Sequence, residues 1–116
     1  MSNKIRILLA EDEQMLAEIL SDTLTDRGFE VALAYNGEQA MQMAHADHFD
    51  VIVTDVMMPR LDGFSLTRRL RSEGRNVPVL FLTARSATED VVQGFKVGGN
   101  DFLRKPFAID ELIVRV

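Results

Sequence analysis

The feature that most constrains the fold is the run from Val51 to Thr54, which ends abruptly at Asp55. Apolar and β-branched residues in succession indicate a strand buried on both faces, as in a parallel sheet covered by helices. Pro59 opposes an immediate helix, and Asp62-Gly63 is typical of a turn. Asp55 is therefore expected at the carboxyl end of a buried strand, the edge at which open α/β sheets bind ligands.

Strand-like and helix-like segments alternate along the whole chain. The expected strands are 5–10, 29–34, 51–55, 79–83 and 101–104, and the expected helices are 14–27, 38–46, 63–72, 88–97 and one that opens near residue 109. In the first helix Leu16, Ile19, Leu20, Thr23 and Leu24 recur at helical spacing, and Gly28 marks its end. Five βα units with short connections predict an α/β fold, a parallel sheet between helices.

Length and composition bound the class of protein. The 116 residues predict one domain over 1–116, and the last helix is still apolar-periodic at Val116, so we expect the natural polypeptide to continue. The absence of cysteine excludes disulfides and thiolate chemistry. The net charge of −5 argues against nucleic-acid or anionic-membrane binding by this domain. With no apolar run of membrane-spanning length, a cytoplasmic domain is expected.

Polar residues end four of the five expected strands. They are Glu11 and Asp12, Asp55, Thr83 and Lys105. Since parallel strands end at one edge, these groups should converge. Clustered carboxylates repel unless a cation sits among them, and oxygen ligands favour Mg²⁺ or Mn²⁺. Lysine and hydroxyl groups suit a phosphoryl group, and a central carboxylate can itself become an aspartyl phosphate. The plain alternative is that Asp55 only caps a turn.

Five motifs occur together in a distinctive order. They are Glu11-Asp12, Asp55 followed by Met58-Pro59, Asp62-Gly63, Thr83-Ala84 and Lys105-Pro106-Phe107. In this order they closely resemble the receiver domain of two-component response regulators, and the resemblance covers the whole chain. It implies a flavodoxin-like sheet of strand order 2-1-3-4-5 with helices on both faces.

The resemblance also implies a role for each site residue. Asp55 is implied as the phosphoacceptor. Asp12, Glu11 acting through water, Asp55 and the backbone carbonyl of Met57 are implied as the site for Mg²⁺, for which Mn²⁺ can substitute.

Three further residues are implied in switching. Thr83 is implied to turn its hydroxyl to the phosphoryl group, and Lys105 to pair with it. Phe102 occupies the place of the switch aromatic, which is often tyrosine.

The implied partners follow from the same resemblance. A histidine kinase would supply the phosphoryl group, and the domain would catalyse only its own phosphorylation and dephosphorylation. Segments such as Thr83-Ala-Arg85 and Asp101-Phe-Leu resemble the winged-helix transcription-factor subclass most. That subclass implies a phosphorylation-favoured homodimer through the fourth helix, fifth strand and fifth helix, with Asp101 and Arg115 in the interface. DNA would be bound only through a domain beyond Val116.

Other functions make different demands on the sequence. An aspartyl-phosphate phosphohydrolase would need a second acid where Met57 stands. A flavin or nucleotide domain would need a Gly/Ser/Thr-rich loop where Glu11-Asp12-Glu13 stands. A phosphorylation-independent interaction module would usually lack one of the site residues. In His45-Ala-Asp-His48 the two histidines could bind a metal ion together, or one of them could donate a phosphoryl group. We expect instead that this segment is solvated surface.

Overall fold

The computed structural model describes residues 4–58, 60–83, 99 and 101–104. Their five parallel strands lie in the order β2-β1-β3-β4-β5, which confirms the expected fold. The strands are β1 (Arg6–Ala10), β2 (Glu30–Ala34), β3 (Val51–Asp55), β4 (Val79–Thr83) and β5 (Asp101–Arg104). The helices are α1 (Gln14–Asp26), α2 (Gly37–Ala46) and α3 (Gly63–Ser72). The helices predicted over 88–97 and from residue 109 lie outside the described residues.

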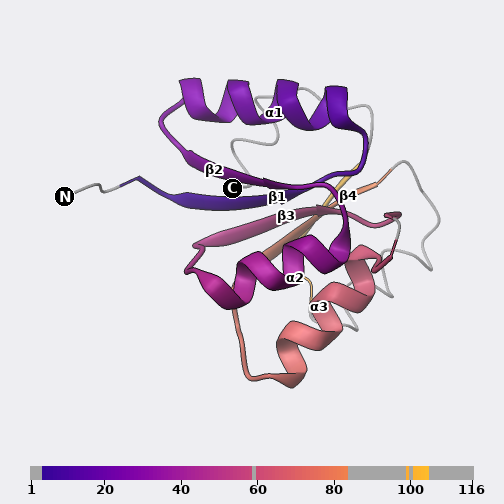
Figure 1. Cartoon of the computed structure of the whole chain (residues 1–116). Helices are drawn as coiled ribbons and strands as arrows, with labels where there is room; N and C mark the ends of the chain where they lie inside the picture. The colour runs from indigo at the N-terminus through magenta and orange to yellow at the C-terminus, as the bar shows by residue number, and fades with distance from the viewer. Residues whose placement is uncertain (1–3, 59, 84–98, 100, 105–116) are drawn as a thin grey trace.

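Helices cover the two faces of the sheet unequally in the described part. Figure 1 shows α1 on one face and α2 with α3 on the other. Successive side chains of β1 point to opposite faces of the sheet, so they pack alternately against the two helical layers. Ile7 and Leu9 pack in the cluster that includes Leu24 of α1, whereas Leu8 joins the cluster that includes Leu66 of α3. These side chains of β1, α1 and α3 are all fully buried. Two apolar cores therefore hold the sheet between its two helical layers.

The position of β1 places the carboxylate residues where the connections of neighbouring strands leave the sheet on opposite faces. β1 pairs with β2 on one side and with β3 on the other. The chain leaves β1 for α1 on one face and leaves β3 for α3 on the opposite face (Figure 1). Where adjacent parallel strands send their connections to opposite faces, a crevice opens beyond their carboxyl ends.

Most element ends agree with the sequence prediction to within a residue. Helix α1 ends at Asp26, and Gly28 follows with a φ of 95°, which favours glycine. Helix α2 begins at Gly37, one residue earlier than predicted, because the Asn36 side chain accepts a hydrogen bond from the backbone N–H of Gln39. Ile19 is 56% exposed although it fits the apolar spacing of α1. No described helix has the length and apolar character needed to cross a membrane.

Candidate functional site

Three carboxylates meet at the carboxyl edge of the sheet. Glu11, Asp12 and Asp55 each offer a ligand oxygen, and these oxygens all lie within 4.8 Å of one another. Glu11 is fully buried and Asp55 is only 8% exposed, whereas Asp12 is open to solvent. Within the described part of the chain, no other group of three potential metal ligands is so close.

Backbone pairing places these carboxylates side by side. Ala10 of β1 is the register partner of Thr54 of β3, so the next residues, Glu11 and Asp55, follow side by side at the carboxyl edge of the sheet. The backbone N–H of Glu11 donates to the carbonyl of Ala34 at 3.0 Å, which extends the pairing of β1 with β2 past the strand end. Asp55 thus lies within β3, Glu11 is tied to β2 directly after the end of β1, and the exposed Asp12 lies in the loop that follows.

Local hydrogen bonds orient the two buried carboxylates. An oxygen of Glu11, Oε2, accepts from the backbone N–H of Glu13 at 3.2 Å. Oδ1 of Asp55 accepts from the backbone N–H of Met57, also at 3.2 Å. Each carboxylate is therefore held by the backbone two residues further on, so the oxygens converge before any ligand arrives.

The donor set fits a hard divalent cation. Three carboxylates so close together repel one another, and a cation among them removes that repulsion. All the donors are oxygens, which Mg²⁺ and Mn²⁺ prefer. One carboxylate is exposed and the other two are mostly buried, so a cation here keeps an open side for water or for a phosphate oxygen.

The segment between Asp55 and α3, of which residues 56–58 and 60–62 are described, is called here the Asp55 loop. The backbone N–H of Gly63 donates to the carbonyl of Val56 at 2.9 Å and closes this loop. The side chain of Asp62 accepts from the backbone N–H of Ser65 at 2.7 Å and caps α3. A Cβ at Gly63 would overlap the carbonyl oxygen of Asp55. The sequence identified Asp62-Gly63 as a turn but gave no sign of this close approach.

The other predicted site residues are described only in part. Thr83 is the last residue of β4, which pairs with β3 through Leu82 and Asp55, so its backbone ends at the same edge. Phe102 lies in β5 opposite Phe81. Lys105 and Arg115 lie outside the described residues. Their predicted roles stay predictions.

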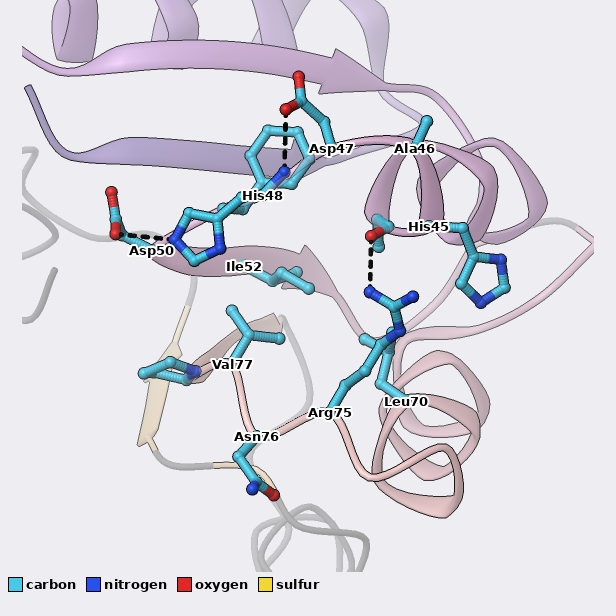
Figure 2. A pocket seen from close by; sticks show the side chains of 13 residues that line it. His45, Ala46, Asp47, His48, Asp50, Ile52, Leu70, Arg75, Asn76 and Val77 are labelled. Atoms are coloured by element: carbon cyan, nitrogen blue, oxygen red, sulfur yellow. Dashed lines mark hydrogen bonds and ion pairs between the residues drawn. The ribbon is translucent and has the colours of Figure 1, made fainter. Parts of the chain in front are cut away.

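A pocket lies at the end of the sheet opposite to these carboxylates (Figure 2). It has a volume of about 600 Å³ and lies between the end of α2, the start of β3 and the connection from α3 to β4. Both histidines of the chain line it: Nε2 of His45 is 2.7 Å from Glu73, and Nε2 of His48 is 3.5 Å from Asp50. The two imidazoles are partly or largely exposed, in keeping with the expected solvated surface, and each has its own acidic partner.

Comparisons with known proteins converge on one family. A family profile described as "Response regulator receiver domain" matches residues 7–116. The chain is 44% identical over 112 residues to the response regulator MprA of Mycobacterium ulcerans, covering 97% of this chain and 48% of MprA. It is 39% identical over 116 residues to the transcriptional regulatory protein RprY of Bacteroides fragilis, covering 100% of this chain and 49% of RprY. The chain thus spans about half the length of these curated relatives.

Solved structures give the same result. The receiver domain of the Francisella response regulator 1452 superposes with a TM-score of 0.93 at 39% identity, covering 97% of this chain and 93% of that one. The Vibrio cholerae chemotaxis protein CheY4 superposes with a TM-score of 0.91 at 32% identity, covering 97% of this chain and 95% of that one.

Proposed function

We propose that Asp55 accepts a phosphoryl group from a histidine kinase, because this chain belongs to the family of response regulator receiver domains. The observation that carries the proposal is the position of Asp55. It ends the buried strand β3, is 8% exposed, and offers an oxygen within 4.8 Å of those of Glu11 and Asp12. A carboxylate in that place can act as a nucleophile.

The acidic cluster would hold a divalent cation for this reaction. Receiver domains generally bind Mg²⁺ at an acidic pocket, and in this chain Asp12, Asp55, Glu11 through water and the backbone carbonyl of Met57 are the proposed ligands. When bound, Mg²⁺ neutralises the carboxylates and the charge on the transferring phosphoryl group. Mn²⁺ has the same preference for oxygen donors.

The chain itself supplies position and orientation. An oxygen of Asp55 attacks the phosphorus as the P–N bond of the phosphohistidine breaks. The bonding electron pair stays on the imidazole nitrogen, which takes a proton from water, and an acyl phosphate remains on Asp55. The hydrogen bond from the backbone N–H of Met57 holds Oδ1 of Asp55, so its carboxylate is pre-oriented for in-line transfer.

Switching is the second part of the proposal. The new dianion draws the hydroxyl of Thr83 and the ammonium of Lys105 toward it, and Phe102 follows into the space that Thr83 leaves. The changed surface favours a homodimer that includes Asp101 and Arg115. We propose that the switch controls transcription, because the relative RprY is a transcriptional regulatory protein. RprY is about twice as long as this chain.

The experiment that tests phosphorylation is intact mass spectrometry after incubation with Mg²⁺ and acetyl phosphate. We expect one added phosphoryl group that is labile to hydroxylamine and absent from Asp55→Ala. No adduct with this donor or with phosphoramidate, despite Mg²⁺ binding, would indicate an interaction module that works without phosphorylation. Continuous release of phosphate from many equivalents of donor would indicate a phosphohydrolase. Size-exclusion chromatography of the phosphorylated sample tests the dimer.

A further inference from the structure

The start of α2 supports the Asp55 loop, although the sequence gives this helix no role in the site. The loop carries the Met57 carbonyl, a proposed metal ligand, but has little regular structure of its own. At its end it is held by Gly63 and by the Asp62 cap of α3. At its start the backbone N–H of Val56 donates to the carbonyl of Leu82 in β4 at 3.1 Å. Two further contacts run to α2, which belongs to a different βα unit.

The first contact is a close approach of two backbones. Gly37, the first residue of α2, is buried, and a Cβ on it would overlap the carbonyl oxygen and carbon of Leu61. Leu61 is itself only 8% exposed and packs in the core cluster that includes Ala40 and Met41 of α2. No residue other than glycine fits at position 37 without displacing the loop.

The second contact is an ion pair across the same junction. Nη1 of Arg60 lies 3.2 Å from Oε2 of Glu38. Arg60 has a φ of 70°, a left-handed conformation that costs a non-glycine residue free energy and persists where its surroundings impose it. The ion pair to α2 and the burial of Leu61 are two such constraints.

The start of α2 is rigid enough to act as a support. The Asn36 side chain accepts from the backbone N–H of Gln39 at 2.8 Å, and the Gln39 side chain accepts from the backbone N–H of Tyr35 at 2.8 Å. This reciprocal pair fixes the first turn of the helix on both sides of its cap.

We propose that Gly37 and Glu38 are positioning residues for the site, because they hold the Asp55 loop in the conformation that presents its metal-binding carbonyl. This inference rests on the proposed function, since the Met57 carbonyl matters only if the site binds a cation. Outer residues that orient metal ligands commonly change metal affinity by about tenfold or more when replaced.

The test compares Mg²⁺ affinities of unphosphorylated variants, measured by NMR titration of backbone amides, with urea unfolding to measure stability. In Gly37→Ala we expect Mg²⁺ to bind about tenfold more weakly. Gly28→Ala is the matched control: it strains a φ of 95° on an exposed turn with open space around it, and should lower stability while leaving Mg²⁺ affinity unchanged. A folded Gly37→Ala with Mg²⁺ affinity within twofold of wild type would overturn the inference.

A second pair of variants decides the question if Gly37→Ala does not fold. Glu38→Gln removes the ion pair, and we expect about a twofold loss of Mg²⁺ affinity, with recovery in the charge swap Glu38→Arg/Arg60→Glu. Glu18→Gln on the exposed face of α1 is its control. Equal affinities in Glu38→Gln and Glu18→Gln, with no effect of the swap, would overturn the inference. If the wild type binds Mg²⁺ but Asp55 takes no phosphoryl group, the proposed function fails while this comparison still stands.

Discussion

At the scale of single residues, Glu11 is the fully buried member of the carboxylate cluster. It brings a negative charge next to those of Asp12 and Asp55, and burial strengthens their repulsion. A glutamine at position 11 would keep the shape and an acceptor for the N–H of Glu13.

Glu11→Gln should therefore weaken the metal site. Mg²⁺ affinity, measured by NMR titration of backbone amides, should fall about tenfold, because one charge that attracts the cation is gone. An Mg²⁺ affinity equal to that of wild type would contradict this prediction.

A second residue-scale feature is the set of acids around Arg6, at the far end of the sheet from the site. The Arg6 guanidinium donates to both oxygens of Asp47, which holds the pKa of that carboxyl well below its ordinary value of 3.8. The backbone N–H of Arg6 donates to Asp50 at 2.8 Å and lowers the pKa of Asp50 as well.

Both carboxyls contribute to the pH dependence of stability. A carboxyl whose pKa is lower in the folded state stabilises the protein above its unfolded pKa, here near 3.8. That stability is lost as the pH falls below 3.8 toward the folded values. Asp47→Asn should therefore show a shallower loss of stability than wild type below pH 4, measured by urea unfolding across pH. Parallel curves for the two proteins would contradict this.

The sequence predicted the acids of the site better than it predicted their support. The convergence of Glu11, Asp12 and Asp55 could be predicted because these acids directly follow two apolar runs, and parallel strands end at one edge. Gly37 lies just before the helix predicted over 38–46, and no sequence pattern gives it a role in the site. Its close approach to Leu61 joins two loops that are far apart in the sequence.

At the scale of elements, α1 shows where helical spacing stops being informative. Leu24 is fully buried and Ile19 is 56% exposed, although both fit one apolar pattern. The spacing predicts the helix, but the buried face is narrower than the apolar pattern, since only Ala17, Leu20 and Leu24 of α1 are buried. The strands were easier to predict, since near-continuous apolar runs in β3 and β4 match burial on both faces.

This difference predicts unequal effects of truncation along α1. Leu24→Ala should lower the free energy of unfolding by about 2 to 5 kcal/mol, because it leaves a cavity against Ile7 and Leu9. Ile19→Ala should change it by no more than about 0.5 kcal/mol. Urea denaturation of both variants checks the comparison, and a similar large loss in both would mean that Ile19 is covered in solution.

At the scale of the whole molecule, the metal site exists only when β1 and β3 are paired. Glu11 and Asp55 lie far apart in the sequence, so an unfolded chain offers no comparable cluster. A cation that binds the cluster therefore binds the folded state alone and stabilises it by mass action.

Mg²⁺ should raise the free energy of unfolding by about 2.7 kcal/mol when its free concentration is about 100 times its dissociation constant. Thermal unfolding at increasing MgCl₂ concentration measures this, with matched NaCl concentrations to remove ionic-strength effects. The increase should be strongly reduced in Asp55→Ala. An equal increase in that variant would mean that Mg²⁺ acts elsewhere on the protein.

The close approaches at Gly37 and Gly63 also bear on how this sequence can change over generations. Each position leaves room for a hydrogen atom and nothing larger, one against Leu61 and the other against Asp55. In a library of all single substitutions selected for signalling, both positions should therefore be as intolerant as Asp55, although neither carries a functional group. The two glycines would then limit the substitutions that this protein can accept as strongly as the acids of the site do.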